Sequence, residues 1–81
     1  MSLADQKLKQ VMARVFDVDV AEIAETASND TVERWDSLRH MNLIIAIEEE
    51  FGLEFSGEQV ADSINYKLIR IVLQEHGVSF S

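Results

Sequence analysis

Apolar residues recur along most of the chain at the spacing of an α-helix. Near the N-terminus they follow the i, i+3, i+4, i+7, i+8 pattern that lines one helical face: Leu8, Val11, Met12, Val15 and Phe16. Ser2 is suited to cap this helix, and Asp5 stands three residues later as its capping-box partner. The pattern therefore predicts a first helix from Ser2 to about Phe16.

Between Asp17 and Asp36 the helical pattern breaks into short polar and apolar steps, which predicts a long ordered connection. Its expected anchors are the apolar residues Val18, Val20, Ile23, Val32 and Trp35. Loops of this length are uncommon in small domains and are often functional.

A second helix is predicted from Asp36, which can cap it, to Phe51, after which Gly52 can serve as the C-cap. Its apolar residues form two stripes on opposite sides of the helix. We expect the first stripe to face the core: Leu43, Ile44, Ile47 and Phe51. The second, which lies nearer Ser37, is either further core or an exposed docking strip: Leu38, Met41 and Ile45.

Two more helices are predicted after Gly52. A short one starts at Ser56 and runs to about Asp62, and the last begins after Asn65 as its cap and ends at Gly77. Apolar residues cover much of the circumference of the last helix: Leu68, Ile69, Ile71, Val72 and Leu73. The fold class is therefore all-α, a small bundle of three main helices and one short helix, with a long loop between helices 1 and 2.

Length and composition narrow the possible functions. An 81-residue chain has room for one domain with a modest core, which disfavours a self-contained enzyme. The chain has no Cys, which excludes disulfides, thiolate metal sites and a nucleophilic thiol. The longest apolar run, Leu43 to Ile47, is too short to span a bilayer, and the N-terminus has no signal-like apolar region. We expect a soluble, cytoplasmic protein.

The net charge of -8 is unevenly distributed. Residues 17–62 carry thirteen acidic residues against Arg34 and Arg39, whereas the two flanking segments are slightly basic. An acidic surface repels phosphate backbones and attracts basic proteins, so we expect a protein partner and no nucleic acid. Acidic residues that only keep a small domain soluble are the alternative.

Three candidate chemistries are disfavoured by the sequence. The acids after Phe16 do not match a calcium-binding EF-hand loop, because Ala21 and Glu22 occupy the positions of a ligand and the invariant glycine. The acidic run 48–50 points in three directions around a helix, so it does not converge on one metal ion. Ser37 and His40 resemble a nucleophile and its base, but no nucleophile elbow or oxyanion hole accompanies them, so we expect a partly buried or surface histidine.

The remaining motif is Asp36-Ser37 at a helix start. Both residue types commonly form caps, and position alone leaves that role open. The alternative is that an exposed hydroxyl in the first turn carries a phosphate ester, stabilised by free backbone N–H groups and the helix dipole.

The segment Trp35-Asp36-Ser37-Leu38, followed by residues 43–52 with their Glu-Glu-Glu-Phe-Gly ending, resembles the carrier-protein family, and most closely the acyl carrier proteins. The resemblance covers nearly the whole chain, so residues 1–81 would form a single acyl-carrier-like domain. It implies that Ser37 carries covalent 4'-phosphopantetheine, donated by coenzyme A through a phosphopantetheinyl transferase. The arm would hold acyl groups as thioesters, and its thiol would account for the absence of Cys.

The resemblance also implies roles for neighbouring residues. Asp36 would help to engage the transferase and its metal, and the second stripe would be the docking strip. Glu48 and Glu49 would meet basic residues of acyl-transferring or acyl-activating enzymes and synthases. The protein would be a monomeric carrier for fatty-acid, lipid or polyketide biosynthesis, with no catalytic residues and no bound metal of its own.

The chain departs from the family where partners are chosen. Family members often carry acids just after the signature serine, whereas this chain has Arg39, His40 and Asn42. From this we expect a specialised rather than a housekeeping carrier, with Arg39 among the partner-binding residues. Asn65 and Tyr66 replace the Thr-Val that commonly starts the last helix. An aminoacyl or peptidyl carrier, or an unmodified helical interaction module in which Ser37 only caps, remain the alternatives.

Overall fold

The computed structural model describes residues 3–24, 27–28 and 35–80 of the 81-residue chain. In chain order it contains α1 (Leu3–Phe16), the 3₁₀ turn η1 (Val20–Glu22), α2 (Ser37–Phe51), α3 (Gly57–Asp62) and α4 (Tyr66–Glu75). This order confirms the predicted all-α bundle of three main helices and one short helix. No helix in the described ranges is both long and apolar enough to cross a membrane.

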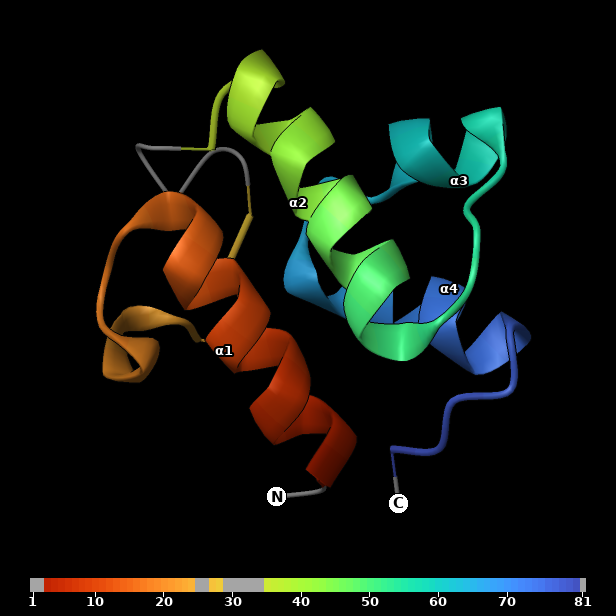
Figure 1. Ribbon diagram of the computed structural model, residues 1–81, viewed down its shortest axis with the longest axis horizontal. Helices are drawn as coiled ribbons and strands as arrows, with labels where there is room; N and C mark the ends of the chain where they lie inside the picture. The colour runs from red at the N-terminus through yellow and green to blue at the C-terminus, as the bar shows by residue number, and fades with distance from the viewer. Residues whose placement is uncertain (1–2, 25–26, 29–34, 81) are drawn as a thin grey trace.

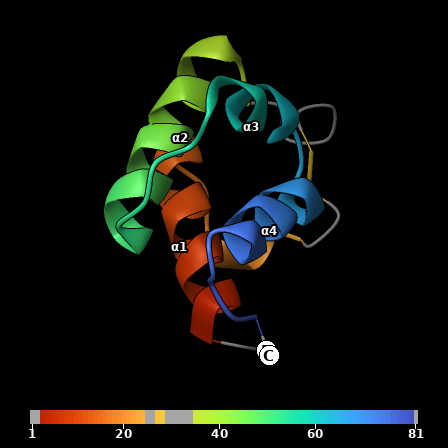
Figure 2. The ribbon, with the colours of Figure 1, turned by 90° about the vertical axis from the view of Figure 1, so that its right-hand side faces the viewer.

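The helices pack around one core, with α1 beside α2 and α4 crossing behind α2 in Figure 1. The turned view in Figure 2 shows α3 next to the first half of α2, above α4. In both views α2 begins at one end of the molecule. The start of α1 and the end of the described chain lie at the opposite end.

The core is built from the predicted apolar faces. Most of the first helix's stripe is fully buried, and so are Leu43 and Ile47 of α2 and Ile69 and Leu73 of α4. Phe51 is only half-buried, at the edge of the same cluster. The central residues of each main helix thus contact one another through side chains that the 3.6-residue period places on one face.

The connection between α1 and α2 is held by some of its predicted anchors. Ile23 and Trp35 are buried in the core, and Val18 packs partly against it. Val20 was wrongly expected to be an anchor: it is 45% exposed, because η1 lies on the surface and buries none of its residues. Val32, like the predicted cap Ser2, lies outside the described residues.

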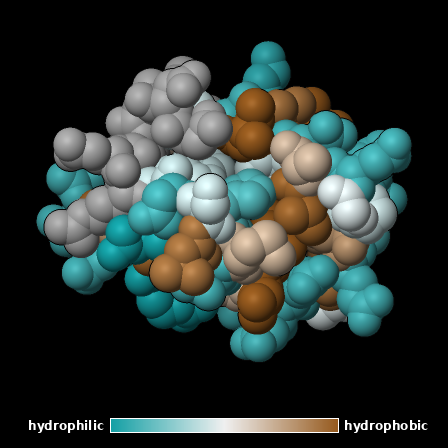
Figure 3. Space-filling view, turned by 90° about the horizontal axis from the view of Figure 1, so that it is seen from above, coloured by the Kyte–Doolittle hydropathy of each residue, from teal (hydrophilic) through white to brown (hydrophobic). Residues whose placement is uncertain are grey.

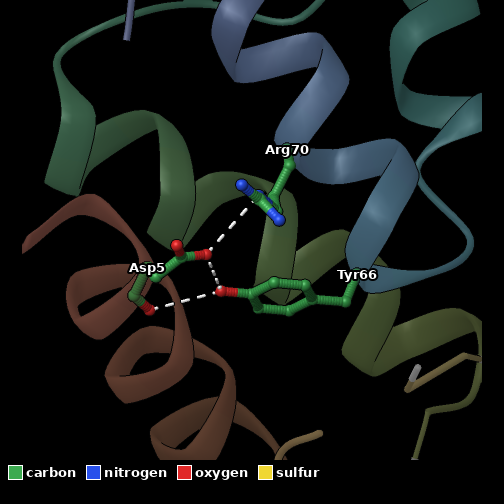
Figure 4. A network of polar contacts seen from close by, with 3 residues as sticks. All are labelled: Asp5, Tyr66 and Arg70. Atoms are coloured by element: carbon green, nitrogen blue, oxygen red, sulfur yellow. Dashed lines mark hydrogen bonds and ion pairs between the residues drawn. The ribbon is translucent and has the colours of Figure 1, made fainter. Parts of the chain in front are cut away.

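The start of α4 is tied to that connection and to α1. The Tyr66 amide donates to the Ala27 carbonyl at 2.9 Å, next to an isolated antiparallel bridge between Ser28 and Asn65. Asn65 caps α4 as predicted, since its side chain accepts from the Leu68 amide. The Tyr66 side chain is buried and reaches Asp5 on α1 (Figure 4). The unusual pair at this helix start thus has a structural role.

Candidate functional site

Ser37 is the first residue of α2, and its side chain is exposed at the end of the molecule where that helix begins. Asp36 is the N-cap, as predicted: its backbone is extended and its Oδ1 accepts from the Arg39 amide at 2.8 Å. The free amides of a first helical turn and the positive end of the helix dipole favour a negative group there. The Ser37 hydroxyl therefore lies at the end of α2 that favours a negative group.

Arg39 forms an ion pair with the residue that caps the helix. Its Nη1 lies 3.6 Å from Oδ2 of Asp36, and both side chains are substantially exposed, 39% and 57%. An exposed pair of this kind contributes little to stability. Its consequence is electrostatic: a cation partly offsets the Asp36 charge immediately beside Ser37.

His40 is partly buried, as predicted, and both of its ring nitrogens are engaged. Nδ1 accepts from Nε1 of Trp35 at 3.0 Å, and Nε2 lies 2.8 Å from the carbonyl oxygen of Val60. The Trp35 and His40 rings also stack, with centroids 6.2 Å apart. With both nitrogens committed to these partners, the ring is not placed to act as a base for Ser37.

The second stripe of α2 faces solvent. Leu38 is 72% exposed, Met41 49% and Ile45 50%, whereas Leu43, Ile44 and Ile47 are buried. The apolar residues that the helix projection left in doubt are therefore not core. Large apolar side chains gathered on one exposed face are typical of a surface that contacts another protein.

The three glutamates at the end of α2 differ in how exposed their side chains are. Oε2 of Glu48 accepts from the Phe55 amide at 2.7 Å, so this carboxylate supports the turn after Gly52. Glu49 and Glu50 are exposed. Within the described ranges, no group of three or more His, Asp or Glu side chains is arranged to hold a metal ion.

A groove of about 590 Å³ opens beside Ser37, between α2 and the segment that contains α3. Figure 3 looks onto this end of the molecule and shows apolar side chains interspersed with polar ones across it. The groove is lined by residues from both sides of that boundary: Trp35, Asp36, Ser37, His40, Met41, Gly57, Val60, Ala61 and Ile64. Its volume falls within the range of small-molecule pockets, and its lining is mostly apolar.

Sequence reasoning placed Asp36, Ser37 and the exposed stripe together but missed the far side of the groove. Val60, Ala61 and Ile64 are far from Ser37 in the chain, and no spacing rule pairs them with it. The contact between His40 and Val60 was equally invisible, because it depends on how α3 packs. One weak indication of a contact near Ser37 was available: Trp35 and His40 are the aromatic residues nearest to it along the sequence.

Comparison with known proteins shows what most of the chain is similar to. Residues 6–69 match a family model described as the phosphopantetheine attachment site. The matched range includes α2 and therefore Ser37. The chain is also 35% identical over 65 residues to the acyl carrier protein of Buchnera aphidicola subsp. Schizaphis graminum (strain Sg). That alignment covers 80% of this chain and 81% of the relative.

Proposed function

Because the chain belongs to the acyl carrier proteins, which carry a phosphopantetheine attachment site, we propose that Ser37 is the attached residue and that the protein carries acyl intermediates between enzymes. The observation that supports this most directly is the exposed Ser37 hydroxyl in the first turn of α2, beside an apolar groove. The bound 4'-phosphopantetheine would supply the thiol that forms thioesters, which a chain without Cys lacks.

Attachment requires the Ser37 hydroxyl to be reachable by another enzyme. In this step the Ser37 Oγ–P bond forms while the pyrophosphate bond of coenzyme A breaks. The nucleotide portion leaves, and the hydroxyl proton passes to a base of the phosphopantetheinyl transferase. The base must come from the transferase, because His40 is engaged by Trp35 and Val60. This supports a carrier rather than an enzyme.

Asp36 would serve both the helix and the transferase. Its Oδ1 caps α2, while its side chain remains 57% exposed next to Ser37. A carboxylate in that position can ligate the transferase's magnesium ion. The phosphodiester, once formed, would lie against the free amides at the start of α2.

The docking surface would run from Ser37 along the exposed face of α2. The apolar contact would come from Leu38, Met41 and Ile45, which are all at least 49% exposed. At the far end Glu49 is exposed and suited to a basic partner residue. Glu48 would contribute through its negative charge, with one oxygen already bonded to the Phe55 amide.

Arg39 supports a specialised carrier. A partner selected for an acidic surface beside the serine would meet a cation here, already paired with Asp36. We therefore expect Arg39→Asp to strengthen binding to a ketosynthase of housekeeping fatty-acid synthesis, measured by titration. Lys67→Asp is the matched control, because it makes the same charge reversal at an exposed position of α4 that does not line the groove. Unchanged affinity in Arg39→Asp would contradict the specialised role.

The proposal as a whole is tested by intact mass after incubation with coenzyme A, Mg²⁺ and a broad-specificity phosphopantetheinyl transferase. We expect the mass to increase by one phosphopantetheine in the wild type and not in Ser37→Ala. A gain in both proteins would show that a residue other than Ser37 is modified. No gain in a folded wild type, with the transferase active on another carrier, would favour an unmodified helical interaction module. Loading with aminoacyl rather than acyl groups by partner enzymes would favour a peptidyl carrier.

A further inference from the structure

His40 connects three parts of the molecule from its position one turn after Ser37. Because Nδ1 accepts a hydrogen bond from Trp35, that nitrogen carries no hydrogen, and the ring proton is on Nε2. Nε2–H then donates to the Val60 carbonyl at 2.8 Å. This tautomer, assigned from the two hydrogen bonds, satisfies both partners at once.

The bond to Val60 matters because α3 is short. A helix of six residues is well below the length of about 12–15 residues at which isolated helices become marginally stable. Its last carbonyl groups also have no partners within the helix. Val60 is near that end, and its carbonyl also accepts a long 3.4 Å contact from the Ser63 amide. His40 therefore caps α3 from a neighbouring helix.

The same contact forms part of the groove beside Ser37. His40 and Met41 line it from α2, and Val60 and Ala61 line it from α3. The position of α3 thus sets the width of the groove. The His40 ring lines the groove and, through its bond to Val60, links the α2 side of the groove to the α3 side. The apolar side chains of Met41, Val60 and Ile64 suit an apolar chain better than a charged one.

We infer that His40 is a positioning residue, which holds α3 in place so that the groove receives the apolar part of the cargo nearest the arm on Ser37. This inference rests on the proposed function for the cargo, but its first step concerns the unmodified protein alone. His40 acts through α3, and its role requires no contact with the cargo thioester or the transferase.

The first experiment measures amide hydrogen exchange of the unmodified protein by NMR. In His40→Ala we expect the amides of residues 60–63 to exchange about tenfold faster. The loss of one hydrogen bond should raise the equilibrium constant for local opening of α3 by about that factor. His40→Gln, whose amide can donate to Val60, should stay within about threefold of wild type. Asn42→Ala changes an exposed residue of the same helix and should have no effect. Unchanged exchange in α3, or an equal rise in α1 and α3, would overturn the inference.

The second experiment loads wild type, His40→Ala and Asn42→Ala with a coenzyme A analogue whose arm ends in a short alkyl chain and an environment-sensitive fluorophore. We expect emission at longer, water-like wavelengths in His40→Ala than in the other two proteins. Equal emission, or emission at shorter wavelengths in His40→Ala, would overturn the role in cargo placement. Failure of the wild type to be loaded would instead contradict the proposed function, and the exchange result would still decide whether His40 holds α3.

Discussion

The hydroxyl of Tyr66 donates a 2.6 Å hydrogen bond to Oδ1 of Asp5, which lies 61 positions earlier in the chain. Both side chains are buried, and Nε of Arg70 lies 3.5 Å from the same carboxylate oxygen (Figure 4). The contact joins the first turn of α1 to the first turn of α4. A buried carboxylate is stable only when it is paired and hydrogen-bonded, so these partners are necessary for Asp5 to lie there.

Removing the Tyr66 hydroxyl should therefore destabilise the fold. We expect Tyr66→Phe to lower the free energy of unfolding by about 1–3 kcal/mol, because the hydrogen bond goes to a buried carboxylate. Urea denaturation monitored by circular dichroism measures the change. In an Asp5→Ala background the same substitution should cost at least about 1 kcal/mol less. Equal costs in the two backgrounds would show that the hydroxyl acts through another group.

Two glycines should respond in opposite ways to alanine. Gly52 ends α2 with φ of 67°, and an added Cβ would meet nothing within 4 Å, so only backbone strain opposes it. Gly52→Ala should therefore lower stability by about 1–2 kcal/mol. Gly57 also has open space but no positive φ, and it begins α3, so Gly57→Ala should raise stability by about 0.4–1 kcal/mol. Melting curves that shift in the same direction for both variants would contradict the conclusion that only Gly52 is required for its backbone conformation.

Asp36 offers a way to separate capping from recognition. Asp36→Ala should lose about 1 kcal/mol of stability, whereas Asp36→Asn should keep the cap and nearly all of the stability. If the charge of Asp36 engages the transferase, both variants should be loaded with phosphopantetheine more slowly than wild type. Loading rates from intact mass, compared with unfolding free energies, test this. An Asn variant loaded at the wild-type rate would limit Asp36 to a structural role.

The two faces of α2 should differ in what they support. Ile47→Ala removes a fully buried side chain and should cost about 2–5 kcal/mol. Ile45→Ala removes a half-exposed one and should change stability by less than about 1 kcal/mol, yet weaken binding to the transferase. Denaturation and binding titrations measure the two effects. A stability loss at Ile45 as large as that at Ile47 would contradict the docking face.

The elements that depend on local signals were predictable from the sequence. The bounds of α2, its Asp36 cap and its Gly52 end follow from residue types at adjacent positions, and the two stripes follow from the helical period. The projection alone did not decide whether the stripe with Met41 was buried. That outcome depends on how many neighbouring helices a small bundle can place around α2.

The contacts that the sequence did not reveal are long-range or depend on a single side chain. Nothing in the pattern indicates that Tyr66 reaches Asp5, or that His40 caps α3, because each pair is brought together only by packing. Val20 fits the apolar pattern of an anchor but lies on a surface turn. An apolar residue in a loop thus predicts burial less reliably than one in a periodic helix.

The start of α1 and the end of the described chain lie at one end of the molecule, and Ser37 begins α2 at the other (Figure 1). A tag, surface linker or fluorescent fusion joined at either end would therefore extend away from the serine and its groove. The protein can be immobilised by one end while an enzyme approaches the other. Measurements of loading and docking on an anchored sample should match those made with the untethered chain.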